Sequence, residues 1–139
     1  MKRSLSIPSE LRYLSDVENF IHAFLKEEAL PISQMGFIVL TICESVNNAI
    51  THGNKGDYQK QVDIRMESTG AQLMIEIEDE GHGFDFRSIP DPTEDNNIKN
   101  ERGRGIFIIK NLADHVEFAN NGSLVKIKFN LRSEHQFLL

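Results

Sequence analysis

The sequence predicts an α/β (α+β) fold, a two-layer sandwich in which three helices cover one face of a mixed, mainly antiparallel sheet. Apolar and polar residues alternate over 62–67, over 72–78 and again over 125–131. This period of two is typical of strands that bury only one face. Apolar residues recur at helical spacing over 11–25 and 33–51, and such helices can cover the buried face.

Length, composition and charge indicate one domain over residues 1–139. With 40% hydrophobic and 26% charged residues, the composition is that of an ordinary globular protein. The formal net charge of -6 argues against sequence-independent binding to nucleic acid, which relies on clustered lysine and arginine. No signal peptide is expected, and the sequence contains no apolar run long enough to span a bilayer. With Cys43 as its single cysteine, the chain is expected to be cytoplasmic.

The N-terminal third is predicted to be a strand followed by two helices. Residues 2–7 alternate weakly, and a helical pattern begins after Ser9, which is placed as its N-cap. Pro31 separates this helix from the next. The second helix runs over 33–51 and stops at His52–Gly53, because glycine commonly terminates helices.

The middle of the chain is predicted to be a β-hairpin followed by a lid. The two alternating runs flank Gly70, which turns the chain. Residues 80–104 are polar and rich in Gly, Pro, Asp and Asn, and so long a connection in a compact domain is more often a functional lid than a simple linker. The remaining elements are a helix over 106–113 and strands over 116–119 and 125–131.

The second predicted helix has a polar side formed by Glu44, Asn47, Asn48 and Thr51. A solvated surface is the simpler explanation, but asparagine and threonine are poor helix formers, and exposed helix surfaces favour Lys, Glu, Gln and Arg. Phe37 and Leu40 continue this side toward the N-terminus, so it is not expected simply to face water. The pattern favours a binding site beside an apolar floor.

A second polar patch follows the hairpin at residues 79–83. Period-two alternation places Asp79 on the buried face of its strand, and a buried carboxylate needs a partner. No lysine or arginine lies nearby in sequence. Gly81 and Gly83 allow the backbone to approach a flat or bulky group. A simple turn leaving a strand is the alternative interpretation.

A third patch places Gly103 and Gly105 directly before the third predicted helix. Free amides at a helix N-terminus bind phosphate, and Arg102 and Arg104 add positive charge. Taken alone, the pattern is equally that of a flexible joint. The P-loop, the G-x-G-x-x-G signature and the kinase loops of eukaryotic type are absent from the sequence.

In this order the patches resemble the motifs of the GHKL (Bergerat-fold) ATPases, which contain a histidine kinase-like ATPase domain. The resemblance is closest to the small bacterial anti-sigma factor serine/threonine-protein kinases. Glu44-x-x-x-Asn48-Ala49-x-x-His52-Gly53 is similar to the N box, Asp79-x-Gly81-x-Gly83 to the G1 box, and Gly103-x-Gly105 to the G2 box. Gly122–Ser123 stands where the family usually has Gly-Thr. The resemblance covers nearly the whole chain, with an ATP lid at about 80–104.

The resemblance implies roles for the matched polar residues. Glu44 would act as the general base, and Asn48 would ligate the Mg²⁺ that bridges the phosphates. The spacing from Glu44 favours Asn48 over Asn47 for this role. Asp79 would accept the adenine amino group, and Ser123 would support Asp79 through its hydroxyl.

The resemblance also implies roles for the glycines and for one arginine. Gly81 and Gly83 would let the chain pass close to the base. Gly103 and Gly105 would hinge the lid and offer amides to the phosphates. Arg104 would contact a phosphate, with a solvated lid arginine as the alternative.

The function implied is that of an ATP-binding, Mg²⁺-dependent serine/threonine-protein kinase. It would phosphorylate a small antagonist protein and bind a sigma factor, so that phosphorylation switches the partner that is held. A homodimer through the leading strand and helix is expected, with no direct contact to nucleic acid or membrane. One alternative is a nucleotide-dependent protein-binding regulator without kinase activity, which has less need of Glu44. The catalytic domain of a sensor histidine kinase is disfavoured, because no helix with a phosphoacceptor histidine is present in the sequence.

Overall fold

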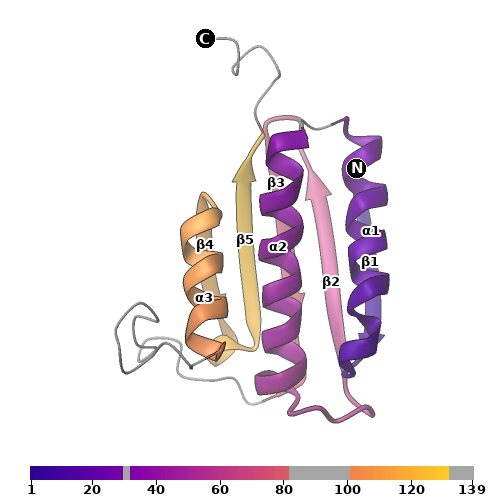
Figure 1. Ribbon diagram of the computed structural model, residues 1–139, viewed down its shortest axis with the longest axis vertical. Coiled ribbons are helices and arrows are strands. Elements are labelled where there is room, and N and C mark those ends of the chain that lie inside the picture. The colour runs from indigo at the N-terminus through magenta and orange to yellow at the C-terminus, as the bar shows by residue number, and fades with distance from the viewer. Residues whose placement is uncertain (30–31, 82–100, 132–139) are drawn as a thin grey trace.

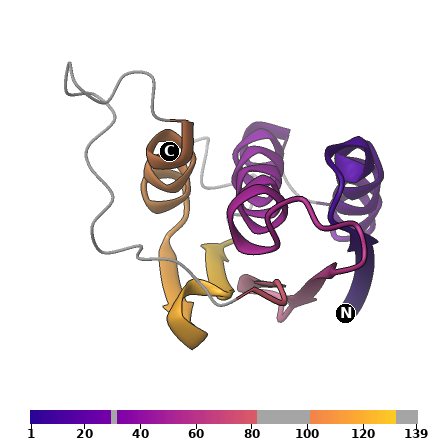
Figure 2. The same cartoon turned by 90° about the horizontal axis from the view of Figure 1, so that it is seen from below.

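The computed structural model describes residues 1–29, 32–81 and 101–131. Within these ranges, three helices lie side by side over one face of a five-stranded sheet (Figure 1; Figure 2). The helices are α1 (Leu14–Glu27), α2 (Ile32–Asn48) and α3 (Glu101–Leu112). The strands are β1 (Lys2–Pro8), β2 (Gln61–Ser68), β3 (Gln72–Glu78), β4 (His115–Ala119) and β5 (Leu124–Asn130). The two-layer α/β sandwich predicted from the sequence is confirmed.

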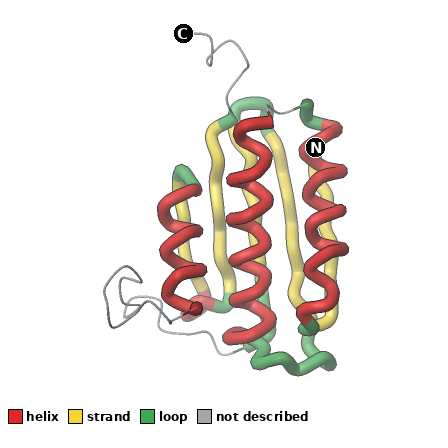
Figure 3. Tube along the Cα trace, viewed as in Figure 1, coloured by secondary structure: helices red, strands yellow, loops and turns green. Residues whose placement is uncertain are grey.

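The sheet has the strand order β1-β2-β3-β5-β4, and each described pair of neighbours is antiparallel. Figure 3 shows the strands, in yellow, behind the red helices. The sequence predicted a mixed, mainly antiparallel sheet. All four pairings between the described strands are antiparallel. The register pairs Ile64 with Ile77, and Ile77 with Val125. Apolar residues of one face therefore line up across the three central strands.

The core lies between this face of the sheet and the helices. Buried residues of α1 and α2 recur every three or four positions, as expected of helices that press one side against a sheet. They include Val17, Ile21, Phe24, Leu25, Ile38, Ile42 and Val46. Burial also raises the pKa of the Cys43 thiol to about 11, so Cys43 stays neutral and packs as a small apolar residue.

The ends of the helices differ from the prediction. Ser9 does not cap a helix, because a short 3₁₀ turn, Leu11–Tyr13, precedes α1 and the Ser9 hydroxyl donates to the carbonyl of Lys60 at 2.7 Å. The second helix ends in a π-helical turn, Ala49–Gly53. Helix α3 begins at Glu101, several residues before the predicted start.

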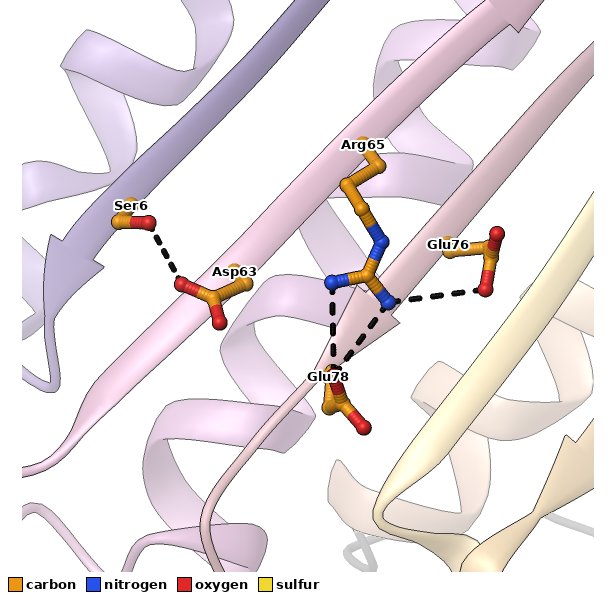
Figure 4. Close-up of polar contacts among 5 residues, drawn as sticks. All are labelled: Ser6, Asp63, Arg65, Glu76 and Glu78. Carbon is orange, nitrogen blue, oxygen red and sulfur yellow. Dashed lines mark hydrogen bonds and ion pairs between the residues drawn. The ribbon is translucent and has the colours of Figure 1, made fainter.

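The opposite face of the sheet carries paired charges (Figure 4). Arg65 lies 3.4 Å from a carboxylate oxygen of Glu78 and 3.5 Å from one of Glu76, and the Ser6 hydroxyl donates to Asp63 at 2.5 Å. These side chains are partly exposed and bond to one another across strands.

Among the described helices, none is long and apolar enough to cross a membrane.

Candidate functional site

The three polar patches of the sequence meet at one end of the sandwich. The C-terminal half of α2, the chain leaving β3, the first turns of α3 and the β4–β5 connection together line a cavity of about 10 Å³. Its lining consists of Ser45, Asn48, Ala49, Ile77, Asp79, Ile106, Ile109, Phe118, Gly122 and Val125. The sequence prediction that the patches form one site is therefore consistent with the geometry.

Glu44 and Asn48 lie one turn apart on the side of α2 that meets α3. A Cβ atom added to Gly105 would lie 3.0 Å from Glu44 Oε2 and 3.2 Å from Asn48 Nδ2. Helix α3 thus packs directly over both side chains, and glycine at position 105 permits this contact. Burial raises the pKa of Glu44, which makes its carboxylate a better proton acceptor. Asn48 is buried, and its Nδ2 has no hydrogen-bond partner among the described residues.

The rest of the polar side of α2 faces outward. The Thr51 hydroxyl donates to Asn47 Oδ1 at 3.1 Å, in an exposed position. Phe37 and Leu40 are 54% and 43% exposed. These two side chains, which continue the polar side toward the N-terminus, are therefore open to water, whereas Asn48 on the same side is buried.

Asp79 points into the sandwich, as its place in the alternation predicted, and is only 7% exposed. The amide of Gly81 donates to Asp79 Oδ1 at 2.8 Å, and no ion pair to Asp79 occurs within the described residues. Burial raises the pKa of Asp79, and the Gly81 amide offsets part of this shift. The carboxylate therefore keeps acceptor capacity for a ligand that donates hydrogen bonds.

Two glycines hold the chain close to Asp79. A Cβ atom added to Gly53 would lie 2.8 Å from Asp79 Oδ1 and closer still to Oδ2, while real Cβ contacts below 3.0 Å are essentially unknown. A Cβ atom at Gly81 would overlap the carbonyl of Gly53. Both positions need glycine, so the end of the N box and the start of the G1 box are packed backbone to backbone.

Ser123 is linked to Asp79 through the backbone. The Asp79 amide donates to the Ser123 carbonyl at 2.9 Å, whereas the Ser123 hydroxyl donates to the carbonyl of Asn120 at 2.9 Å. Within the described part of the chain, the Ser123 hydroxyl does not bond to the Asp79 carboxylate, in contrast to the predicted support. Ser123 is buried beside the cavity and closes the turn that leads into β5.

Asn54 organises this end of the site and was missed by the sequence analysis. Its Nδ2 donates to Ser9 Oγ at 2.7 Å and to the Gln61 carbonyl at 3.0 Å, and its Oδ1 accepts from the Glu80 amide at 2.8 Å. Because the hydroxyl hydrogen of Ser9 is directed to Lys60, Ser9 can only accept from position 54, which therefore requires an amide donor. An asparagine directly after the helix-ending glycine was the available signal.

The remaining predicted residues are only partly described. Gly83 lies outside the described residues. Gly103 and Arg104 fall within the first turns of α3, so the glycine pair lies inside the helix and not before it.

Several polar groups of the site retain hydrogen-bonding capacity that a polar ligand could use. The described residues contain no group of three or more His, Cys, Asp or Glu that could hold a metal ion alone. A single amide oxygen such as that of Asn48 suits Mg²⁺, which is usually held by one or two protein ligands together with phosphates and water. The unpartnered Asn48 Nδ2 and Ser45 Oγ and the acceptor capacity of Asp79 would all be met by a polar ligand.

Comparison with known proteins agrees with this geometry. The profile of the histidine kinase-like ATPase domain matches residues 7–129. The chain belongs to this family. It is 31% identical over 116 residues to the anti-sigma F factors of Bacillus thuringiensis (strain Al Hakam) and Bacillus anthracis (strain A0248), covering 79% of this chain and 80% of theirs.

A solved structure shares the fold of this histidine kinase-like ATPase domain. The crystal structure of the RsbU and RsbW domains of Rv1364c from Mycobacterium tuberculosis matches with a TM-score of 0.68 at 16% identity. The match covers 96% of this chain and 33% of that chain. Membership of an ATPase family implies that the ligand is ATP, and the polar groups around the cavity are of the kind that a nucleotide requires.

Proposed function

We propose that this chain is an Mg·ATP-dependent serine/threonine-protein kinase that phosphorylates a small antagonist protein and holds a sigma factor. The observation that carries the proposal is the pairing of Glu44 with Asn48 beneath Gly105. A domain that only bound nucleotide would need the amide but not the neighbouring carboxylate. The similarity to anti-sigma F factors supports the choice of partners.

The residues divide the work of phosphoryl transfer between positioning and proton transfer. Asp79 would hold the adenine amino group, and Asn48 would hold Mg²⁺, which when bound supplies positive charge for the transferred group. Glu44 accepts the proton of the attacking hydroxyl, and its raised pKa suits it to that role. Gly105 brings the α3 backbone close to the phosphate end without a side chain in between.

The test is a phosphotransfer assay with a matched control. Proteins retained by the immobilised chain from cells that express it would be identified by mass spectrometry and then incubated with the chain and radiolabelled ATP. Glu44→Gln should retain ATP affinity but lose transfer to serine or threonine by about 100-fold or more. Glu67→Gln makes the same change at a glutamate on the outer sheet face, where Glu67 lies 3.8 Å from Lys2, and should leave both properties unchanged.

The second candidate function is nucleotide-dependent partner binding without transfer. Exposed Phe37 and Leu40 on α2 favour it, because apolar side chains on an open helix side suit a protein partner. ATP-dependent retention of a partner with no phosphate transfer, and with equal behaviour of wild type and Glu44→Gln, would establish this function and overturn the kinase.

A further inference from the structure

Asn54 is a buried side chain that joins the ends of three strands. It is 1% exposed, and its backbone amide donates to the Ala49 carbonyl, in the turn that ends α2, at 2.8 Å. Its side chain bonds to Ser9 after β1, to Gln61 at the start of β2 and to Glu80 after β3. A buried polar group whose bonds are all formed in this way has one orientation, so it can fix the groups that it contacts.

The bond to Asn54 fixes one of the two peptide groups that flank Asp79. The amide of Glu80 belongs to the peptide group that follows Asp79, and Asn54 Oδ1 accepts from this amide at 2.8 Å. The peptide group before Asp79 is held as well, because the Asp79 amide donates to the Ser123 carbonyl at 2.9 Å. Peptide groups are planar, so holding both of them sets the two backbone dihedrals of Asp79 and the direction of its side chain.

Other contacts define the direction of Asp79 less well. The Gly81 amide donates to Asp79 Oδ1 at 2.8 Å, but both residues belong to the same turn and would move together. The Glu80 carboxylate accepts from the Gln61 amide in an exposed position, where water competes for the bond. The bond from the Glu80 amide to Asn54 is part-buried and connects this turn to the end of α2, so it holds the turn more firmly.

We propose that Asn54 is a positioning residue for ATP binding, which fixes the backbone at Asp79 so that the carboxylate already has the direction that ATP requires. This inference rests on the proposed function, because it takes ATP as the ligand of Asp79. Preorganisation of this kind strengthens binding although the residue does not touch the ligand. Phosphate transfer at saturating ATP depends much less on it, because Glu44 and Asn48 share no described bond with Asn54.

The experiment compares Asn54→Ala with Ser9→Ala, a matched control from the same cluster. Ser9→Ala removes two hydrogen bonds of the cluster, those to Lys60 and to Asn54. It leaves Asn54 bonded to the Gln61 carbonyl and to the Glu80 amide. Both variants should melt below wild type, by roughly 4–10 °C. Only Asn54→Ala should bind Mg·ATP more weakly in calorimetry, by roughly tenfold, at a temperature at which both variants are folded.

Transfer kinetics and a second variant separate positioning from stability. Asn54→Ala should raise the KM for ATP roughly tenfold and leave kcat within about twofold of wild type. Asn54→Asp keeps an oxygen for the Glu80 amide but loses both donor bonds of the side chain. It should therefore lose stability yet bind Mg·ATP within about threefold of wild type, and it provides the test if Asn54→Ala does not fold.

The outcomes that contradict positioning differ from those that contradict ATP binding. Wild-type affinity for Mg·ATP in folded Asn54→Ala, or an equal loss of affinity in Ser9→Ala, would overturn the inference. A fall in kcat without a rise in KM would overturn it too, and so would a tenfold loss of affinity in Asn54→Asp. Failure of the wild type to bind Mg·ATP would instead refute the proposed function, and this inference with it.

Discussion

Replacement of Gly53 by alanine tests the packing that positions Asp79. Gly53 lies in the π-helical turn that ends α2, and its Cα faces the Asp79 carboxylate. A methyl group there would lie 2.8 Å from Asp79 Oδ1, whereas ordinary contacts begin near 3.4 Å. Even this oxygen must retreat by about 0.6 Å, and Oδ2 by more, so the 2.8 Å bond from the Gly81 amide would be stretched beyond normal length.

The expected magnitudes follow from these contacts. Alanine gains about 0.5–1 kcal/mol over glycine in helical backbone, but crowding a packed site costs about 1–3 kcal/mol. The free energy of unfolding of Gly53→Ala should therefore fall by about 0–2.5 kcal/mol. Displacing Asp79 should weaken a hydrogen bond to a charged group, a loss of about 1.5–3 kcal/mol, and so lower ATP affinity by roughly tenfold to 100-fold.

Gly36→Ala is the matched control, because a Cβ atom added at this position of α2 would have no neighbour within 4 Å. It should raise the unfolding free energy by about 0.5–1 kcal/mol in a urea titration and leave ATP affinity unchanged in calorimetry. Wild-type ATP affinity in Gly53→Ala would refute the assignment of Asp79 to the base. An equal loss of affinity in both variants would show that the effect does not depend on contact with Asp79.

Three further variants test the site. Asp79→Asn should abolish ATP binding yet raise the unfolding free energy at pH 7. Because burial raises the folded-state pKa of Asp79, this gain in stability should shrink as the pH falls through that pKa. A gain independent of pH would contradict this explanation. Asn54→Ala should lower the unfolding free energy by about 2 kcal/mol or more in urea, since it strands three hydrogen-bonding groups, and a change below 0.5 kcal/mol would be unexpected. Gly105→Ala should keep the unfolding free energy within about 1 kcal/mol of wild type. It should slow phosphotransfer more than it weakens ATP binding, because its methyl group would press on Glu44. A wild-type transfer rate would show that this contact does not matter for transfer.

The strands were predictable from the sequence because their pattern is local. Each buried residue of β3 is two positions from the next, and extending the alternation by one step placed Asp79 inward. The position of β5 between β3 and β4 was not predicted, because strand order depends on contacts between distant parts of the chain. The alternation of β5 fixes only which of its faces is buried.

The start of α3 and the role of Ser9 were mispredicted because tertiary contacts decide them. Two glycines near the start of α3 lower its intrinsic helix propensity, but packing against α2 adds stability that propensity does not contain. Ser9 has the side chain of an N-cap, yet the Lys60 carbonyl, far along the chain, takes its hydroxyl hydrogen.

The individual boxes of the site were visible in the sequence, but their junction was not. The backbones of Gly53 and Gly81 are in contact although the two residues are far apart in sequence. Neither motif alone predicts that its glycine packs against the glycine of the other motif. Asn54 belongs to neither motif and still bonds to segments on both sides of the junction. Ser45 is buried among the core residues of α2, and it too belongs to none of the motifs.

The distribution of satisfied and unsatisfied polar groups locates function independently of the motifs. On the outer sheet face, Arg65 is paired with Glu76 and Glu78 while partly exposed, so each charge there has both a partner and water (Figure 4). On the helix side, Asn48 Nδ2 and Ser45 Oγ are buried and have no hydrogen-bond partner in the described ranges. There, the contacts of the Asp79 carboxylate include one amide donor and no cation. Groups of this kind destabilise the free fold and border one cavity. Natural folds retain such a cost where a ligand offsets it, so ATP should stabilise this chain more than it stabilises a variant in which these groups have been removed.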